Sequence, residues 1–399
     1  PERKDRRYGA GGRLLEDPDC LYHYDDEGNL VFREFKELQD NAVPHDRKRM
    51  EKERGIRCLA TGMGWLYEWA SNGMLKKVLR PDGRPVEFRY DALGRRTAKR
   101  YFGKVTRWVW DGNVPLHEWS YKAIGLQSDE EKNTTPKEPT EDITTWLFEA
   151  GTFIPTAKIQ GDKQYSIVSD YLGTPIQMYD GQGNKTWDCT LDIYGKVLAV
   201  DKGTEFDCPF RFQGQYADIE TGLYYNRFRY YDSLMSCYLS QDPIGLAGNN
   251  PTLYGYVRDI NTWIDIVGLN VFNSIVWTAP SSGTGNTYRV YQQDIDWDKI
   301  DPKGRTNLQR ASEGLAPIGN DGKSINLHHS KQKGKGPLFE LSGSIHTSYG
   351  HTNILHPYRV TPNTDGTKHH PFDKVDREKF DIDRRQYWID PVSYTHLTL

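Results

Sequence analysis

Short runs in which aromatic and polar residues alternate recur along the first two thirds of the chain. Each run ends in a cluster that combines Asp or Asn with Gly, and a further run follows. The clearest copies are residues 21–30, 66–75 and 88–96, with a weaker copy at 108–113. Alternation with a period of two is typical of a strand, and the Asp/Asn-Gly clusters indicate tight turns. The pattern predicts antiparallel hairpins that must stack into a sheet, because one hairpin cannot bury its aromatic face alone.

The copies are unevenly spaced. Their anchor aromatics are Tyr24, Trp69, Tyr90 and Trp110, so the first interval is twice as long as the others and we expect a degenerate copy inside it. Residues 127–143 contain acidic residues and two prolines but no aromatic residue, which predicts an exposed loop between strands. The aromatic pattern then resumes.

Composition narrows the class of protein. The 399 residues are 13% aromatic, which disfavours a disordered chain, and their number predicts two or three domains. No apolar run approaches the roughly 18–20 residues of a membrane helix, so we expect no spanning segment. The five cysteines fit neither a metal site nor a dense disulfide framework and are expected to be free thiols. A start without Met or a signal peptide indicates part of a longer protein.

The chemistry of the chain changes near residue 269. Eight of the eleven histidines lie between residues 328 and 399, and residues 270–399 carry a net charge of +2, against −5 for residues 1–269. A basic stretch rich in histidine favours binding to phosphate groups. We therefore expect a separate C-terminal unit with a chemistry of its own.

The first two of these histidines, His328 and His329, are adjacent and lie on a predicted strand. A Lys/Gly loop connects this strand to a return strand at 338–341. Neighbouring residues of a strand project to opposite faces, so one histidine can bind a metal while the other faces a substrate. Three imidazoles with one open position suit a catalytic divalent metal. The alternative is that they are ordinary surface or core histidines. The other histidines of this cluster are His346, His351 and His356.

Residues 211–269 carry a specific resemblance. The Tyr-rich run at 214–232 and the Asp-containing motifs at 242–246 and 265–269 resemble the C-terminal end of Rhs (rearrangement hotspot) proteins, and the YD-type repeats extend this resemblance to about 15–269. The resemblance implies a mostly β fold: a YD-repeat β-shell with a toxin attached after its last motif. Such shells are several times longer, so residues 1–269 would be only a fragment of one.

The same resemblance implies that the shell cleaves itself as an aspartyl protease. The scissile bond would follow Leu269, with Asp242 and Asp265 as the catalytic aspartates, and carboxyl groups with different pKa values suit this chemistry. Thr262 and Ile266 depart from the family pattern, in which proline is usual, and this weakens the turn that would present the bond. The alternative is that both aspartates only cap turns.

The histidine cluster resembles toxin nucleases of the HNH/endonuclease VII superfamily, in the group named for its Leu-His-His motif. The resemblance implies a small α+β domain with a ββα-metal motif and a divalent ion, Mg²⁺ or Zn²⁺. In that motif His328 would be a metal ligand, and His329 would be the general base that activates water. The further ligands would be His346 and His351, with His356 as a rival for either.

Three lysines in the loop after the histidine pair would contact backbone phosphates, which position a nucleic acid without reading its sequence. They are Lys331, Lys333 and Lys335. A solvated hairpin tip is the alternative. Residues 389–399 lack the basic ending of this nuclease group, and we expect them to be a non-native tail.

Together these features predict a secreted toxin of bacterial competition. Its parts would be a shell fragment at 1–269, a nuclease at 270–388 and the tail at 389–399. The nuclease would hydrolyse phosphodiester bonds of DNA in the cytoplasm of a target cell. The expected partners are nucleic acid, a cognate immunity protein and a secretion apparatus. The alternatives are a toxin that acts on RNA and a non-enzymatic YD-repeat surface or adhesion protein.

Overall fold

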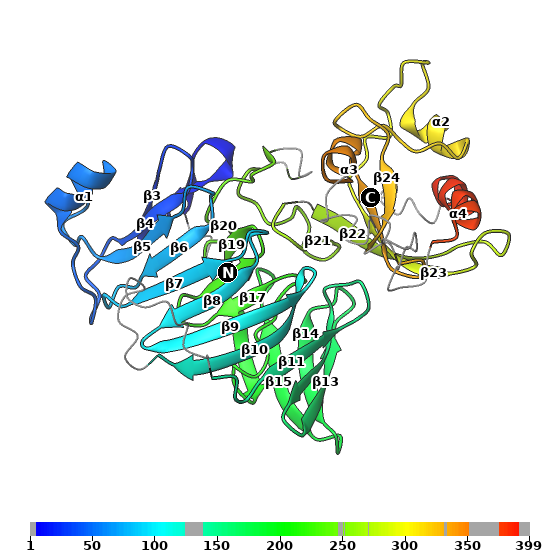
Figure 1. Ribbon diagram of the computed structural model, residues 1–399. Helices are drawn as coiled ribbons and strands as arrows, with labels where there is room; N and C mark the ends of the chain where they lie inside the picture. Colours follow the sequence, from blue (N-terminus) through cyan, green and yellow to red (C-terminus); the bar gives the residue numbers. More distant parts are fainter. Residues whose placement is uncertain are drawn as a thin grey trace, which may run out of the picture. The chain divides into compact units, whose positions relative to one another are not determined.

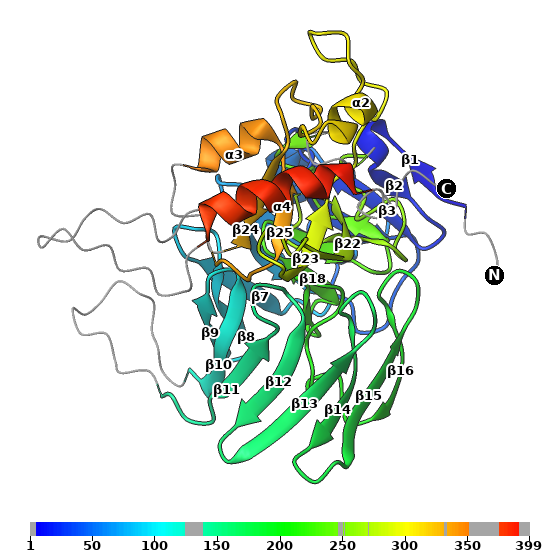
Figure 2. The ribbon, with the colours of Figure 1, turned by 90° about the vertical axis from the view of Figure 1, so that its right-hand side faces the viewer.

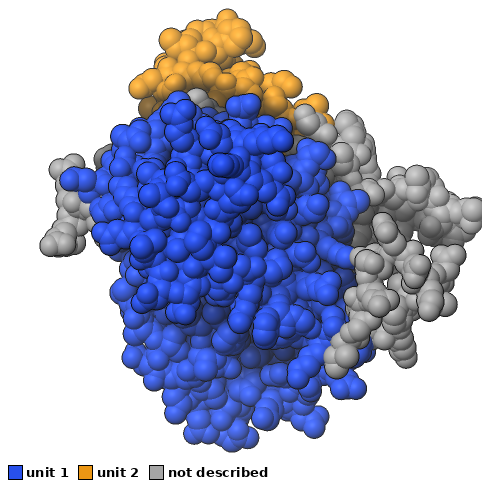
Figure 3. Space-filling view, turned by 90° about the vertical axis from the view of Figure 1, so that its left-hand side faces the viewer, with its two compact units in different colours: residues 1–149, 153–260, 265–269 blue, residues 150–152, 261–264, 270–399 orange. Residues whose placement is uncertain are grey.

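The structure of the chain is a computed structural model that describes residues 5–123, 139–245, 250, 252–269, 271–330, 333–350 and 375–390. The chain divides into two compact units, coloured separately in Figure 3. Unit 1 comprises residues 1–149, 153–260 and 265–269, and unit 2 comprises residues 150–152, 261–264 and 270–399. Strands predominate in the described part of the chain, as the alternating pattern predicts.

Unit 1 is built on a large antiparallel sheet whose sixteen strands follow one another in sequence order, so that each pairs with its neighbours in the chain (Figures 1 and 2). The strands are β1 (Arg7–Tyr8), β2 (Leu14–Glu16), β3 (Cys20–Tyr24), β4 (Leu30–Phe35), β5 (Gly64–Trp69), β6 (Leu75–Leu79), β7 (Pro85–Tyr90), β8 (Arg96–Tyr101), β9 (Lys104–Asp111), β10 (Val114–Lys122), β11 (Thr144–Phe148), β12 (Pro155–Gln160), β13 (Lys163–Ser169), β14 (Pro175–Asp180), β15 (Lys185–Leu191) and β16 (Val197–Lys202). The predicted hairpin series is confirmed.

The Asp-Gly clusters form the turns of these hairpins. The backbone carbonyl of Asp91 accepts from Gly94 N at 2.9 Å, and the Asp91 side chain accepts from the backbone N–H groups of Leu93 and Arg95 at 2.9 Å each. Gly94 has a φ of 74°, a left-handed conformation that residues with a side chain rarely adopt. The aspartate and the glycine are therefore both required by the turn. The same side-chain bonds recur at Asp170, Asp180 and Asp192.

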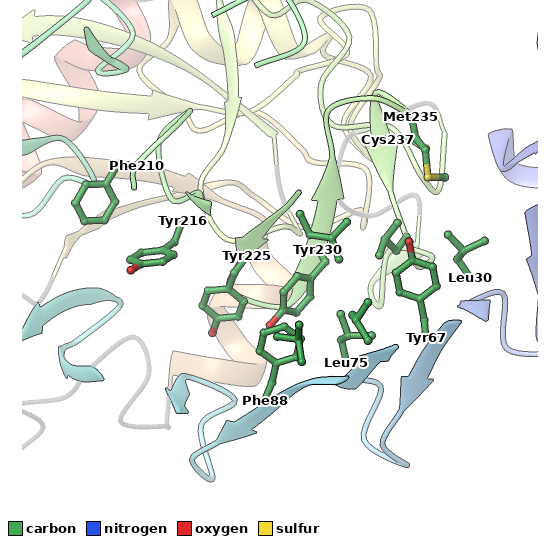
Figure 4. Packing of buried hydrophobic residues seen from close by; sticks show 14 of the residues in the cluster. Leu30, Tyr67, Leu75, Phe88, Phe210, Tyr216, Tyr225, Tyr230, Met235 and Cys237 are labelled. Carbon is green, nitrogen blue, oxygen red and sulfur yellow. The ribbon is translucent and has the colours of Figure 1, made fainter. Parts of the chain in front are cut away.

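The segment that follows the large sheet in the chain packs against one face of that sheet. Its four strands form an antiparallel sheet in sequence order. They are β17 (Tyr216–Asp218), β18 (Leu223–Asn226), β19 (Arg229–Asp232) and β20 (Cys237–Tyr238). Tyr67, Leu75 and Phe88 of the large sheet share one buried cluster with Tyr225 and Tyr230 of the small sheet (Figure 4). This packing provides the burial that a single hairpin lacks.

A buried ion cluster connects the two sheets of unit 1. Arg96, only 1% exposed, forms an ion pair with Asp218, and the Nζ of Lys99 lies 2.9 Å from the other carboxylate oxygen of Asp218. The guanidinium carbon of Arg96 lies 4.5 Å from the ring centroid of Trp108 and 4.6 Å from that of Tyr225. Because an unpaired buried charge is strongly destabilising, these groups depend on one another.

One expectation about the repeats is wrong. Residues 36–63, all of which the structure describes, contain no strand; they contain α1 (Arg47–Arg54), which Asp46 caps at its N-terminus. The long first interval is therefore an insertion and not a degenerate repeat. In the expected loop at 127–143, residues 139–143 form no strand, and 127–138 lie outside the described residues. The five cysteines are free, as expected, and all of them are buried.

Unit 2 is a small α+β unit around a five-stranded sheet with the order β21-β22-β23-β25-β24. Its elements are β21 (Trp263–Asp265, of which Asp265 belongs to unit 1), β22 (Val271–Thr278), β23 (Thr287–Gln292), α2 (Asn307–Ser312), β24 (Asn326–His329), β25 (Leu338–Leu341), α3 (Gly343–Gly350) and α4 (Arg377–Ile389). β23 and β25 are parallel, while β22/β23 and β24/β25 are antiparallel. Figure 1 shows α3 and α4 on opposite sides of β24.

Helix α4 covers one face of this sheet. Its residues Phe380, Tyr387 and Trp388 are buried in a cluster with Trp277 of β22 and other sheet residues. The helix ends at Ile389, and the carboxylate of the next residue, Asp390, accepts from Trp277 Nε1 at 3.1 Å. The helix thus runs one residue beyond the expected domain end, while residues 391–399 lie outside the described part. Within the described ranges, every helix is too short or too polar to cross a bilayer.

Candidate functional sites

The histidine pair lies at the end of β24, in a hairpin with β25. His328 and His329 are opposite Phe339 and Leu338 of β25, so their side chains project from opposite faces of the sheet. The prediction that the two histidines face different surroundings is confirmed by their ring contacts: His328 contacts a residue of α3, and His329 contacts residues of α4 and β23.

His328 and His346 lie close together on one side of the sheet. His328 is 8% exposed, and its ring centroid lies 5.4 Å from that of His346 on α3, with the ring planes at 66°. Two imidazoles that bind one tetrahedral ion at about 2.0–2.1 Å place their ring centroids about 5 Å apart, so this pair fits two ligands of a divalent ion. No cluster of three metal-ligating side chains occurs among the described residues. His351 and His356 lie outside them.

His329 is enclosed by aromatic rings. It is 6% exposed, and its ring centroid lies 4.2 Å from that of Phe380 and 5.7 Å from that of Tyr288. Neither ring nitrogen has a hydrogen bond of good geometry within the described part of the chain. Burial, helped by the positive charge of Arg377, lowers the pKa of His329 to about 4. The expectation that His329 faces a substrate stays a prediction; in this structure its ring is buried between Phe380 and Tyr288.

The loop between β24 and β25 carries the lysines that the sequence singled out. Its ends are joined by a bond from Ser330 N to Pro337 O at 2.9 Å. Lys335 is exposed and Lys333 is half-buried, and Lys331 lies outside the described residues. The exposed position of Lys335 suits a contact with phosphate, and it equally fits the solvated hairpin tip that we kept as the alternative.

A buried hydrogen-bond network that the sequence did not indicate lies on the α4 side of the sheet. Glu340, only 1% exposed, accepts from the hydroxyl of Tyr387 at 2.6 Å and from the backbone N–H of Gln293 at 2.9 Å. Tyr387 in turn accepts from the side chain of Gln292 at 2.7 Å. Burial raises the pKa of Glu340 to about 8. The one sequence feature that could have indicated this network is Glu340 itself, an acidic residue among the apolar residues of the return strand.

A second polar cluster holds the ring of Tyr288 that contacts His329. The buried carboxylate of Asp383 on α4 accepts from Thr284 N at 2.9 Å and from the Tyr288 hydroxyl at 3.2 Å. These bonds fix α4 to the start of β23 and position the aromatic wall around His329. The sequence offers no pattern that pairs residues almost a hundred positions apart.

The three expected self-cleavage residues come together in unit 1 around one arginine that the sequence did not indicate. The Nη2 atom of Arg229 lies 3.0 Å from Asp242 Oδ2 and 3.1 Å from Asp265 Oδ2. Because both carboxylates contact the same nitrogen, they are within two hydrogen-bond lengths of each other. Burial raises the pKa of Asp242 to about 6 and also raises the pKa of Asp265, while the charge of Arg229 opposes both shifts.

The expected scissile bond lies directly beside this pair. Asp265 Oδ1 accepts from Leu269 N at 3.0 Å, and Arg229 Nε donates to the carbonyl of Gly268. Gly268 has a φ of 72°, and a Cβ added there would meet the carbonyl oxygen of Asn226 at 2.6 Å. The turn is therefore held by close backbone packing although Pro is absent from position 266. The aspartates also cap turns, since Asp242 Oδ1 accepts from the backbone N–H of residue 244 at 3.0 Å.

Comparison with family models assigns both parts of the chain. Residues 2–252 match the teneurin YD-shell model. Residues 306–390 match the model described as a nuclease of the HNH/ENDO VII superfamily with conserved LHH. The second match includes the β24–β25 hairpin, α3 and α4, and so contains every described histidine of the site.

Curated relatives cover much of this chain but little of their own length. The chain is 29% identical over 273 residues to Probable deoxyribonuclease RhsB of Dickeya dadantii (strain 3937), which covers 65% of this chain and 16% of that protein. It is 31% identical over 283 residues to Double-stranded DNA deaminase toxin A of Burkholderia cenocepacia (strain H111). That match covers 67% of this chain and 18% of the relative. The chain thus spans less than a fifth of the length of either relative. Among solved structures, a chain of the Photorhabdus luminescens Tc holotoxin pore with a mutation in TccC3 gives a TM-score of 0.41 at 17% identity. The match covers 67% of this chain and 15% of that one.

Proposed function

Because the chain belongs to the teneurin YD-shell family and carries a nuclease domain of the HNH/ENDO VII superfamily, we propose that it is the C-terminal part of a secreted toxin whose metal-dependent endonuclease is attached to a YD-repeat shell. One observation carries the assignment: the residues that match the nuclease model contain a hairpin and a helix that bring His328 and His346 together. The matches to curated relatives do not by themselves identify the activity, since one relative is named a probable deoxyribonuclease and another a DNA deaminase toxin.

In this proposal His328 and His346 hold a divalent ion, with His351 or His356 as a further ligand. Nucleases of the HNH superfamily generally use such an ion, which stabilises negative charge that develops on the phosphate and on the leaving oxygen. The imidazoles are held in place by the β24–β25 hairpin and by α3, so the ligands approach from two elements. Mg²⁺ and Zn²⁺ are both candidates, and a site with imidazole ligands suits Zn²⁺ better than Mg²⁺.

His329 is the proposed general base. It is the last residue of β24, one position after His328, and the loop that follows carries Lys333 and Lys335, whose positive charge suits the backbone phosphates. Because His329 is only 6% exposed and projects from the face opposite to His328, its surroundings must rearrange at the strand end before the imidazole can accept a proton from water. DNA is the preferred substrate and RNA is the alternative. A cognate immunity protein and delivery by a secretion apparatus into the cytoplasm of a target cell complete the proposal.

The test is cleavage of supercoiled plasmid DNA and of structured RNA by the full chain with Mg²⁺, with Zn²⁺ or with a chelator. Wild type should nick the plasmid only when metal is present, and H328A and H329A should lose that activity. H117A in unit 1 is the matched control and should cleave like wild type. Cleavage of RNA alone would transfer the proposal to RNA. No cleavage of either polymer would favour the non-enzymatic surface protein.

We further propose that unit 1 cleaves the chain after Leu269. The supporting observation is the buried contact of Asp242 and Asp265 with Arg229, directly beside the peptide bond to be cut. Two carboxyl groups around one cation can remain in different protonation states, so that one accepts a proton from water while the other donates a proton to the leaving amine.

Self-cleavage is tested by gel electrophoresis of the purified chain. Wild type should separate into fragments of about 30 and 15 kDa, from the average residue mass of this chain of about 115 Da. D242N and D265N should remain intact, whereas D232N, a change of another buried aspartate of unit 1, should not prevent the cut. An intact wild-type chain would refute self-cleavage and leave the nuclease proposal untouched.

A further inference from the structure

Beyond the histidines and the loop lysines, one exposed cation lies next to His329. Arg377 is in the first turn of α4, three residues before Phe380, so the two side chains share one face of the helix. Phe380 is the residue whose ring packs 4.2 Å from that of His329. Arg377 is therefore placed about one helical turn from the contact with His329, at the end where α4 meets the histidine.

The charge of Arg377 is accessible to a ligand. Arg377 is exposed, and among the described residues it has no ion pair. Arg384, another exposed basic residue of this helix, lies almost two turns further along and pairs with Asp381 at 3.2 Å. An exposed guanidinium that forms no ion pair among the described residues is suited to an anionic ligand.

We propose that Arg377 binds a backbone phosphate of the nucleic acid and thereby guides the strand to the His329 side of the hairpin. This inference rests on the proposed nuclease function. The planar guanidinium can donate two parallel hydrogen bonds to one phosphate, which fixes the direction of the strand as well as its position. With Lys335 on the loop, Arg377 places cations on two different elements around His329, and the nucleic acid lies between them.

The inference is tested by binding, separately from cleavage. The affinity of the full chain for a fluorescent DNA duplex is measured by anisotropy in a chelator, at salt concentrations from about 50 to 200 mM. Loss of one phosphate contact should reduce the slope of log K against log salt by about 0.9 in R377Q and weaken binding about tenfold. R377K retains the charge and should keep a slope near that of wild type, with lower affinity.

R384Q is the matched control, because it removes the same charge from the same helix and should leave the slope unchanged. In a metal-containing assay, R377Q should also lower kcat/KM about tenfold while R384Q does not. Equal slopes for R377Q and R384Q, with wild type binding and cutting normally, would overturn this inference alone. A wild type that neither binds nor cuts nucleic acid would overturn the proposed function together with it. Since Arg377 holds no described ion pair, R377Q should give the circular dichroism spectrum of wild type.

Discussion

Replacement of Glu340 by Gln tests the buried network that attaches α4 to the sheet. The folded chain raises the pKa of Glu340 to about 8 because the carboxyl group is buried, whereas its ordinary value is 4.5. Between these two values the folded state retains a proton that the unfolded state has released. The free energy of unfolding must therefore fall as the pH rises through this window, and this slope should be absent from E340Q.

The magnitude follows from the size of the shift. One retained proton changes the free energy of unfolding by about 1.4 kcal/mol per pH unit. Between pH 5 and pH 7, wild type should thus lose about 2 to 3 kcal/mol relative to E340Q. Each oxygen of the Glu340 carboxyl group accepts one hydrogen bond, whereas Gln has a single acceptor oxygen, so E340Q should be less stable at every pH. That cost lowers the free energy of unfolding equally at every pH and does not change its slope against pH.

Hydrogen exchange followed by mass spectrometry measures how the local free energy of opening depends on pH. Opening free energies are obtained for peptides of β25 and α4 in the full chain at pH 5, 6 and 7, after correction for the intrinsic exchange rate. E378Q changes an exposed glutamate in the first turn of α4 and is the matched control. It should keep the wild-type slope. The same slope in wild type and E340Q would refute the assignment of a retained proton to Glu340.

Three further changes test the packing of unit 1. D218N leaves the buried Arg96 without its carboxylate and should lower the free energy of unfolding by about 3–5 kcal/mol, measured by denaturant titration; a loss below about 1 kcal/mol would contradict a tightly coupled pair. D170A removes two hydrogen bonds to the turn backbone and should cost about 1–2 kcal/mol in the same titration, with D170N closer to wild type. G268A introduces a methyl group 2.6 Å from a backbone carbonyl and should slow cleavage after Leu269 at least tenfold on a gel, whereas G183A, at a similar φ but in open space, should not.

Much of the repeat architecture can be read from local sequence. The alternating aromatic residues, the Asp that accepts turn N–H groups and the Gly with positive φ are all contained in stretches of about ten residues, as at Asp91. The opposite orientation of His328 and His329 also follows from their adjacency on a strand. The insertion with α1 was misjudged because an interval of doubled length is compatible with either a weak repeat or an insertion.

The sequence by itself determined which residues form turns, which segments form strands with alternating faces, and where the histidine cluster lies. These properties depend on neighbours within a few positions. Only the tertiary structure decided which distant groups meet. Arg229 contacts Asp265, 36 positions away, and Tyr387 contacts Glu340, 47 positions away. Such pairs form because burial removes water from a polar group and forces it to find another partner. The identity of that partner depends on how the sheets and helices pack, which no local pattern records.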